Sequence, residues 1–385
     1  MKTVYLDNNA TTRVAPEVID AMMPFFKDLW GNPSSMHYFG GQVARHIDKA
    51  RQQIAALINA DPSEIVFTSC GTESDNAAIF GAVEAAGQGV KIITSRVEHP
   101  AVLGPCGRLK ERGYNVMELP VDASGQLNPA DLRRELAGGP AIVTIMWANN
   151  ETGVVFPMDE IARIVRDAGA MLHTDAVQAV GKTPIDVKKT PLDMLSFSGH
   201  KLHAPKGIGV LYIRRGTKVK PFLLGGHQEN SRRGGTENVP YIVGLGTACD
   251  LAMKNMDDEA TRVSALRDKL EKGLLAACPD VRVNGDRAHR LPNTTNLSFQ
   301  YIEGEAILYH LSDLGVCASS GSACTSGSLE PSHVIRAMGV PFTAAHGSIR
   351  FSLSRYNTEG EMDYVIEHMP AIVAKLRALS PFVPS

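Results

Sequence analysis

The sequence runs Ser196-Phe197-Ser198-Gly199-His200-Lys201-Leu202-His203-Ala204-Pro205-Lys206-Gly207 between two apolar segments. Residues 192–197 lead into this stretch and residues 208–213 follow it, and both segments have the composition of buried strands. The stretch itself is small and hydroxyl-bearing, with Lys201 at its centre. It therefore predicts a tight turn between two strands that displays one lysine.

The lysine needs a reason to lie between buried strands, because lysine is rarely buried without a partner or a chemical task. One such task is a Schiff base with an aldehyde cofactor, pyridoxal 5'-phosphate (PLP). Ser198 and His200 would then donate hydrogen bonds to the cofactor phosphate. The alternative is a solvated turn with an ordinary lysine, and the stretch alone leaves both interpretations open.

The composition indicates a globular protein with more than one core. The chain has 385 residues, which exceeds one typical domain, and 44% of them are hydrophobic. A net charge of -2 gives no electrostatic argument for a nucleic acid or an anionic membrane as partner. The N-terminal residues lack a signal-peptide core, and no apolar run is long enough to span a bilayer. Six cysteines without a CxxC pair fit a reducing compartment, so we expect a cytoplasmic protein.

The first two thirds of the sequence alternate between strand and helix patterns. Strands are predicted at residues 65–68, 90–95, 141–147 and 171–174, and helices at 43–58, from 71 and from about 158. Residues 141–147 are continuously apolar, as expected of a strand buried on both faces. This alternation predicts an α/β fold with a mostly parallel sheet covered by helices.

The pattern changes near residue 255. A long amphipathic helix is predicted at 261–277, and shorter strands and helices follow up to 354. We therefore expect a large α/β domain at residues 14–255. Residues 1–13 and 256–385 would form a smaller α+β domain that carries a cysteine-containing loop.

Polar residues follow the predicted strands, where open α/β sheets place ligands. Gly71 and Thr72 begin a helix whose N-terminus suits a phosphate. Asp175 could pair with a protonated pyridine nitrogen, and His99 could stack on a cofactor ring or move protons. Gln178 and Asn150 add uncharged donors. Each of these residues also has an ordinary structural interpretation, such as a cap or a loop contact, and only their combination indicates one site.

Three further features lie outside these loops. The glycine-rich residues 225–238 could close over an anion across a dimer interface, or form a surface loop. Cys324 lies in a Gly/Ser-rich loop that suits a mobile nucleophile, whereas the other five cysteines fit buried, inert positions. Arg350 lies within an apolar strand and would bind a carboxylate, either of a substrate or of the protein.

These residues together resemble the PLP-dependent cysteine desulfurases of the NifS/IscS group, which belong to the class-V aminotransferases of PLP fold type I, an aspartate-aminotransferase-like fold. The resemblance extends over nearly the whole chain and is specific in order and spacing. Its motifs are YLDNNATT (5–12), TSCGTESDN (68–76), EHPAV (98–102), NNETG (149–153), HTDAVQ (173–178), SFSGHKLHAPKG (196–207), RRGGTENV (232–239), SSGSACTSGSLEPSHV (319–334) and SIRFSLS (348–354). The motif SLEPSHVIRAMG and the compact C-terminus are closest to the nitrogen-fixation branch.

The resemblance implies a role for each residue of the site. Lys201 would form the Schiff base with PLP, and Cys324 would be the nucleophile that becomes a persulfide. His99 would stack on the cofactor ring, Asp175 would contact the pyridine nitrogen and Gln178 the phenolic oxygen. The phosphate would be bound by Gly71, Thr72, Ser198 and His200, and by Thr236 from the other subunit of a homodimer. Asn150 and Arg350 would bind the substrate carboxylate. Cys324 would also be a transient iron–sulfur ligand through its persulfide.

The implied activity is a sulfurtransferase reaction that converts L-cysteine to L-alanine and leaves the sulfur on Cys324. An iron–sulfur scaffold protein would accept that sulfur, most specifically for nitrogenase maturation. The sequence leaves four alternatives open: a housekeeping desulfurase, a selenocysteine lyase, a PLP aminotransferase or other PLP lyase, and a cofactor-free scaffold for cluster assembly. Turnover of selenocysteine, amino transfer to pyruvate, or a lack of Schiff-base absorbance would distinguish the last three.

Overall fold

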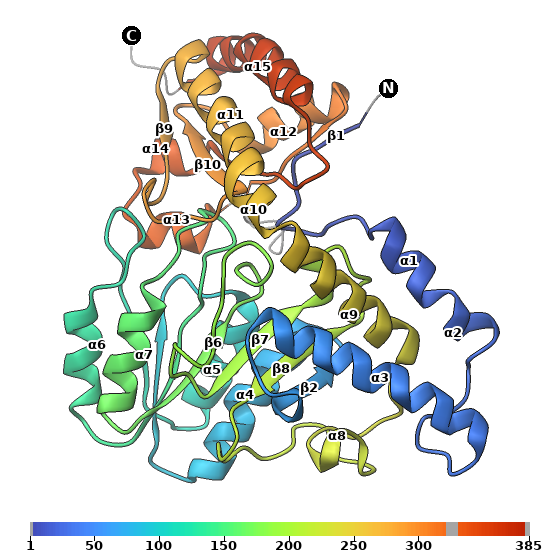
Figure 1. Cartoon of the computed structure of the whole chain (residues 1–385). Helices are drawn as coiled ribbons and strands as arrows, with labels where there is room; N and C mark the ends of the chain where they lie inside the picture. Colours follow the sequence, from blue (N-terminus) through green and yellow to red (C-terminus); the bar gives the residue numbers. More distant parts are fainter. Residues whose placement is uncertain (1–2, 321–329, 382–385) are drawn as a thin grey trace.

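The computed structural model describes residues 3–320 and 330–381, and its larger part is built on a seven-stranded sheet (Figure 1). The strands follow the spatial order β2-β8-β7-β6-β5-β3-β4. Their bounds are β2 Ile65–Thr68, β3 Lys91–Ser95, β4 Val116–Leu119, β5 Ala141–Thr144, β6 Met171–Asp175, β7 Met194–Ser198 and β8 Gly209–Ile213. Only β8 runs in the opposite direction to the other six strands of this sheet, so the prediction of a mostly parallel sheet is confirmed.

Alternate residues of the strands enter two different apolar clusters. In β2, Ile65 and Phe67 pack into one cluster and Val66 into the other. In β5, Val143 and Ile142 divide in the same way. Successive side chains of a strand point to opposite faces, so both faces of this sheet are buried and both must be covered by helices.

The helices cover the two faces unequally. The helices α4 (Gly71–Ala86) and α5 (Pro100–Glu111) pack on one face. The opposite face carries the larger cluster, to which α1 (Pro16–Met22), α2 (Pro24–Lys27), α3 (Tyr38–Leu57), α6 (Pro129–Leu136), α7 (Met158–Asp167) and α9 (Val239–Lys254) contribute. The long helices α3 and α9 lie against each other at the side of the sheet (Figure 1).

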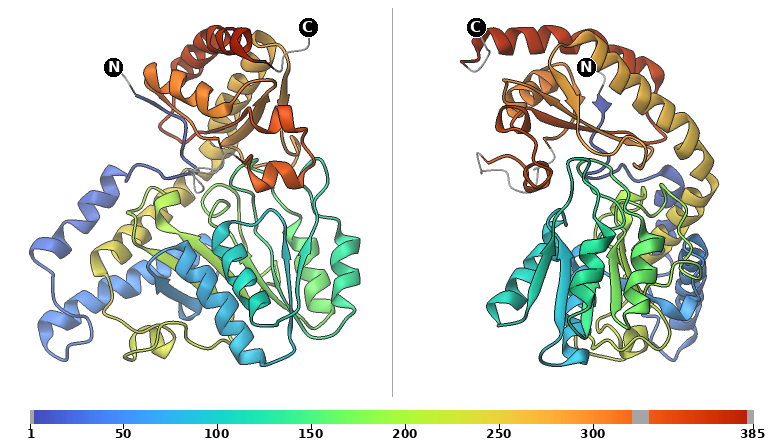
Figure 2. Two further views of the ribbon diagram at one scale, coloured as in Figure 1. Left: turned by 180° about the vertical axis from the view of Figure 1, so that it is seen from behind. Right: turned by 90° about the vertical axis from the view of Figure 1, so that its left-hand side faces the viewer.

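The smaller part has its own sheet and its own apolar cluster. Its antiparallel strands are β9 (Val281–Val283), β10 (Thr294–Phe299) and β12 (Ser348–Ser352), and its helices are α11 (Ser264–Ala277), α12 (Gly304–Asp313) and α15 (Glu359–Leu379). The first strand, β1 (Val4–Tyr5), pairs in parallel with β11 (Val316–Cys317). The N-terminal residues therefore join this C-terminal part, and Figure 2 shows both ends of the chain on it.

Helices connect the two parts. After α9 come α10 (Met256–Asp258) and one turn of π-helix, Glu259–Val263, which continues into α11. The helices α13 (His333–Ala337) and α14 (Phe342–Ala345) contact the larger cluster, although the sequence assigns their residues to the smaller domain. The proposed division near residue 255 thus falls at the end of α9, and it stays a prediction.

Within residues 3–320 and 330–381, none of the helices combines the length and the apolar character needed to cross a membrane.

Candidate active site

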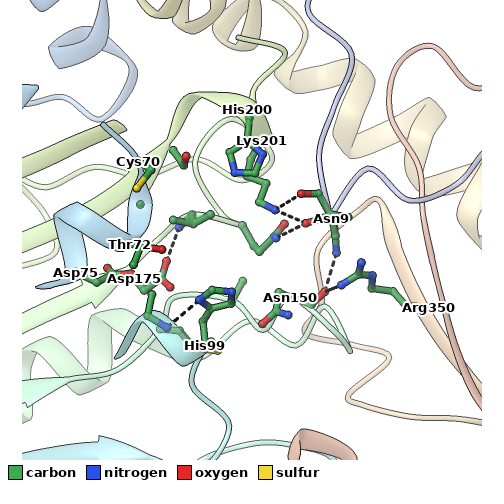
Figure 3. Close-up of a pocket in the computed structure, with 18 residues that line it drawn as sticks. Asn9, Cys70, Thr72, Asp75, His99, Asn150, Asp175, His200, Lys201 and Arg350 are labelled. Carbon is green, nitrogen blue, oxygen red and sulfur yellow. Dashed lines mark hydrogen bonds between the residues drawn. The ribbon is translucent and has the colours of Figure 1, made fainter. Parts of the chain in front are cut away.

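A pocket of about 380 Å³ opens where the strands of the large sheet end, next to the smaller part (Figure 3). Five strands that run in the same direction, β2, β3, β5, β6 and β7, deliver their C-terminal loops to it. Its size is typical of a small-molecule site. The residues that line it are Asn9, Ala10, Cys70, Gly71, Thr72, Asp75, His99, Ala101, Met146, Ala148, Asn150, Asp175, Val177, Gln178, Ser198, His200, Lys201 and Arg350.

The amine of Lys201 is held by backbone carbonyl groups of the N-terminal segment. Lys201 ends a single turn of 3-10 helix, Gly199–Lys201, which follows β7 directly. Its Nζ donates to the carbonyl oxygens of Asn9 (2.5 Å) and Ala10 (2.6 Å), and Figure 3 shows the amine directed at Asn9. The lysine thus reaches into the pocket, with its position fixed by a distant part of the chain.

The N-terminus of α4 forms one wall of the pocket. The residue before the helix, Cys70, makes no side-chain cap, which leaves the first backbone N–H groups of α4 available for an anion. Gly71 permits a close approach here, because a Cβ atom at this position would lie 2.9 Å from Val177 Cγ2. Ser198 Oγ lines the same pocket, is buried and has no hydrogen-bond partner among the described residues. A buried, unpartnered hydroxyl indicates a polar ligand.

His200 lies beside this wall with a fixed ring. Its Nδ1 is 3.2 Å from Thr11 Oγ1, and its own carbonyl oxygen accepts from Thr12 Oγ1 at 2.9 Å. Burial, followed by the neighbouring charge of Lys201, lowers the pKa of His200 to about 4. The ring is therefore neutral at physiological pH and can offer one N–H to a ligand.

Two buried carboxyl groups lie at the floor of the pocket. Asp175, at the end of β6, accepts from the backbone N–H of Val177 at 2.9 Å, and burial raises its pKa to about 6. Asp75, on α4, has a pKa raised well above the usual range, first by burial and then by the charge of Asp175. The fully buried His173 approaches Asp75 at 3.6 Å. Burial lowers the pKa of His173 to about 3, so this ring is neutral.

His99 stands at the start of α5 and forms its cap. Its Nδ1 accepts from the backbone N–H of Ala101 at 3.1 Å, which fixes the orientation of the ring along the pocket. Burial is the main cause that lowers its pKa to about 4, and the charge of Lys201 is the next. A neutral, oriented imidazole suits both predicted tasks, stacking and proton transfer.

Arg350 reaches the pocket from β12 in the smaller part. Its Nη1 donates to the carbonyl oxygen of Asn150 (3.0 Å), and its Nη2 pairs with Asp7 Oδ1 (2.7 Å). Its Nε is buried without a partner among the described residues. The backbone of Arg350 also pairs with Ser319, so residues 319 and 320, which precede the segment that contains Cys324, start next to this arginine.

The pocket brings together nearly all residues that the sequence assigns to the site, while their individual roles stay predictions. Thr236 is exposed and does not line this pocket, so its predicted contact with a second subunit is untested. Cys324 lies outside the described residues, and its predicted roles as nucleophile and iron–sulfur ligand stay predictions too. Among the described residues there is no cluster of three or more metal-binding side chains.

The expectation for the other cysteines is partly wrong. Cys106, Cys249 and Cys278 are buried as expected, but Cys70 and Cys317 are only partly buried. Cys70 lines the pocket because it precedes the helix that forms the wall. The position of Cys70 directly before Gly71 in the sequence could have predicted that it lines the pocket.

The glycine-rich residues 225–238 are anchored to the large part of this chain. They include the short helix α8 (Gln228–Ser231). The carboxylate of Glu229 accepts from Arg51 (2.7 Å) and from the backbone N–H of Phe67 (3.0 Å), and Arg233 pairs with Glu73 at 2.9 Å. Ion pairs thus position the segment at one end, while Thr236 at the other end stays exposed.

Comparison with known proteins identifies the family. A family model described as aminotransferase class-V matches residues 4–365. The chain belongs to the class-V aminotransferase family. Two curated class-V relatives are a cysteine desulfurase of Trichormus azollae (60% identity over 99% of this chain and 96% of the relative) and the cysteine desulfurase NifS of Azotobacter vinelandii (59%, over 99% and 95%).

Solved structures agree with this class-V assignment. A NifS-like protein superposes with a TM-score of 0.92 at 38% identity, over 97% of this chain and 100% of that protein. A structure described as SspA in complex with cysteine gives a TM-score of 0.82 at 35% identity, over 92% and 100%. These neighbours confirm the predicted fold class and the resemblance to the NifS group.

Class-V aminotransferases depend on PLP, and the residues of this pocket fit that cofactor. The uncapped N-terminus of α4 and the unpartnered Ser198 Oγ can bind a phosphate. Asp175 supplies a carboxyl group at the floor, and Lys201 supplies an amine inside the pocket. Three further cavities, of about 70, 20 and 20 Å³, are much smaller.

Proposed function

We propose that this protein is a cysteine desulfurase that takes sulfur from L-cysteine, releases L-alanine and passes the sulfur on from Cys324. The observation that carries the proposal is the pocket itself, which joins Lys201, Asp175 and Arg350 beside the start of the segment that contains Cys324. The named relatives, at about 60% identity over nearly the whole chain, support the same activity.

The acid–base work falls to residues inside the pocket. PLP, when bound, supplies an electron sink for the substrate Cα. Lys201 holds the cofactor and then moves a proton at that carbon, for which its amine is already positioned by Asn9 and Ala10. Asp175 would stabilise a positive charge on the pyridine nitrogen, because a carboxylate that is desolvated by burial favours a cation beside it.

Substrate orientation falls to the smaller part of the chain. Arg350 is nearly fully buried and presents a planar guanidinium to the pocket, which suits the α-carboxylate of an amino acid. Asn150 lines the pocket beside it. Because Arg350 and Asn150 would bind the α-carboxylate, the thiol at the other end of the substrate would point away from them.

The sulfur transfer is a nucleophilic displacement. The thiolate of Cys324 attacks the sulfur of the substrate, so an S–S bond forms and the substrate C–S bond breaks. The electron pair of that bond stays on the carbon skeleton, which takes up protons and leaves as L-alanine. Sulfur remains on Cys324 as a persulfide. Because Nδ1 of His99 accepts from Ala101, the neutral ring carries its proton on Nε2, from which it would donate a hydrogen bond to the substrate sulfur.

The test is incubation with L-cysteine and a thiol reductant while alanine and sulfide are measured. The wild type should form both in equal amounts. Cys324→Ala should keep the absorbance of bound PLP and lose both products, whereas the matched thiol variant Cys317→Ala should retain turnover. Lys201→Ala should lose the Schiff-base absorbance. Normal turnover by Cys324→Ala, or amino transfer to pyruvate without sulfide, would show that the proposal is wrong.

The proposal extends to the biological setting. The persulfide would supply an iron–sulfur scaffold protein, with nitrogenase maturation as the specific process, and Cys324 would act as a transient cluster ligand. The NifS of Azotobacter vinelandii among the relatives supports this branch. Transfer of labelled sulfur from Cys324 to a purified scaffold protein, and its loss in Cys324→Ala, would test the acceptor.

A cytoplasmic homodimer is the proposed assembly. Large apolar side chains around α2 and the start of α3 are exposed, including Trp30 at 70% and Tyr38 at 80% exposure, and a second subunit would cover such a surface. Thr236 would then reach the cofactor phosphate of the other subunit. A molar mass of one chain in solution by light scattering would contradict the dimer.

A further inference from the structure

A second lysine is buried directly behind the pocket. Lys182 is 7% exposed and lies four residues after Gln178, in the turns that follow β6. Gly181 makes this position possible, because its φ is 78° and a Cβ atom there would lie 2.4 Å from Leu202 Cδ2. A nearly buried ammonium group is costly to the fold unless it has partners and a task.

The partner of Lys182 is a residue of the site. Lys182 Nζ donates to Gln178 Oε1 at 2.9 Å. Gln178 Nε2 donates in turn to the carbonyl oxygen of Asn9 at 3.0 Å, and the same oxygen accepts from Lys201 Nζ at 2.5 Å. Two lysines are thus joined through one glutamine side chain and one backbone carbonyl group.

This arrangement decides which way the amide of Gln178 points. Because an ammonium group can only donate, it must face the oxygen of the amide and not the nitrogen. With Oε1 held by Lys182, the NH₂ group faces the other way, and one of its two protons goes to Asn9. The second proton remains for an acceptor, and Gln178 lines the pocket. If Lys182 were absent, the carbonyl group of Asn9 alone would hold the amide in this orientation.

The surroundings of Lys182 allow it to stay without a direct ion pair. Lys182, Lys201 and Glu259 line a second cavity of about 20 Å³, which has room for about one water molecule. Glu259 is buried, and one of its carboxylate oxygens has no partner among the described residues. Burial first, and then the charge of Lys201, lower the pKa of Lys182 to about 7, while the carboxylate of Glu259 acts in the opposite direction.

We propose that Lys182 is a positioning residue of the PLP site, which fixes the side-chain amide of Gln178 so that an N–H donor, and not the carbonyl oxygen, faces the cofactor. This inference rests on the proposed PLP site and adds to it a residue that does not line the pocket. Lys182 acts through Gln178 alone, so its effect must disappear when Gln178 is removed.

The test is a double-mutant cycle on the holoenzyme with two readouts: the pH dependence of the cofactor absorbance band, and the concentration of free PLP at which half of the protein is loaded. A buried acceptor that loses its donor typically weakens binding about tenfold or more. Lys182→Met should therefore raise the half-loading concentration about tenfold and shift the pH midpoint of the band. In the Gln178→Ala background, Lys182→Met should add less than about twofold.

Three further variants separate positioning from folding. Lys189→Met removes a lysine of the same segment whose side chain is 84% exposed, and it should leave both readouts at wild-type values. Lys182→Arg restores a cationic donor and should recover part of the loss. Lys182→Met alone leaves the buried carboxylate of Glu259 without the charge of the lysine. The double variant Lys182→Met with Glu259→Gln removes both charges, so it serves for the test if the single variant does not fold.

Two outcomes would overturn the inference: a folded Lys182→Met variant with wild-type loading and spectrum, or an equal effect of Lys182→Met with and without Gln178. A wild-type protein that binds no PLP would instead overturn the proposed site itself, so the two failures are distinguishable.

Discussion

Arg350 and Asp7 form an ion pair at the edge of the pocket, with 2.7 Å between Nη2 and Oδ1, although the two residues are 343 positions apart in the sequence. Asp7 follows the strand β1, and Arg350 lies on β12. The carboxylate of Asp7 therefore already holds part of the guanidinium that the proposed function assigns to the substrate. A substrate carboxylate must share or displace this partner.

Arg350→Lys tests the substrate role of the guanidinium. Lysine keeps the positive charge but loses the planar, two-pronged donor, so we expect KM for L-cysteine to rise about tenfold or more while PLP loading stays unchanged. Steady-state kinetics with alanine detection, together with the absorbance of the bound cofactor, provides the measurement. An unchanged KM would remove Arg350 from the substrate site.

Asp7→Asn is the complementary change. It removes the competing carboxylate and leaves the guanidinium to the substrate, so KM should fall by about two- to fivefold. The melting temperature should fall as well, because the nearly buried charge of Arg350 loses its partner. If KM rose in this variant, Asp7 would be supporting the substrate site and not competing for it.

Asp75→Asn should make the protein less sensitive to alkaline pH. The pKa of Asp75 is raised in the folded state, so above about pH 4 the native protein holds a proton that the unfolded chain has lost, and stability falls as the pH rises. Asparagine has no such proton. The melting temperature of the variant relative to wild type should therefore increase between pH 5 and pH 8 by at least about 2 °C. A difference that stays constant with pH would contradict this assignment.

Four histidines, two of which line the pocket, should remain neutral over the physiological range. The pKa is lowered to about 4 for His99 and His200, and to about 3 for His173 and His203, in each case chiefly by burial. Each therefore makes the native state less stable as the pH falls below about 6.5, where the unfolded chain gains a proton first. The NMR signals of these four histidine rings, assigned through histidine-to-glutamine variants, should not titrate between pH 5.5 and 8 in ring-labelled protein. A midpoint above pH 6 for one of them would show that its ring is solvated.

Gly209→Ala should displace the N-terminus of α4, which forms the wall of the pocket that suits a phosphate. A Cβ atom at this position would lie 2.6 Å from the carbonyl carbon of Cys70 and 2.7 Å from Thr68 Oγ1, so the turn before α4 must move. We expect a lower melting temperature and about tenfold weaker PLP loading. Gly107→Ala is the matched control: it lies within α5 with open space around it, and it should stabilise the protein by about 0.5–1 kcal/mol. Equal loading by both variants would contradict the prediction.

The sheet could be predicted from the sequence because its central strands are buried on both faces. The strand at residues 65–68 was predicted with its observed bounds, and the others differ by a few residues at their ends. The apolar run 141–147 was predicted too long, because the strand ends at Thr144 and the remaining apolar residues pack as an irregular segment. The strand β4 escaped prediction since it is only half-buried and lies at the edge of the sheet. The long helix α15 was missed although its buried residues recur at helical spacing, and Pro370 inside it is the residue that argues against a helix.

The candidate site was predictable where function depends on side chains at strand ends, as for Asp175 and His99. It was not predictable where the contact depends on tertiary structure. Asp75 reaches the pocket from within α4, and Lys182 acts from behind Gln178. Neither follows a strand directly, so only the folded chain reveals their positions.

The carbonyl oxygen of Asn9, which accepts from both Lys201 and Gln178, has a consequence for how this pocket can be studied. Side-chain replacement at residue 9 leaves that oxygen in place, so alanine scanning cannot measure what it contributes. An amide-to-ester exchange of the following peptide bond, introduced by semisynthesis, would weaken the acceptor without altering any side chain. The part of the molecule that holds the reactive amine is thus hidden from conventional mutagenesis, and variation among related sequences at residue 9 says little about its importance.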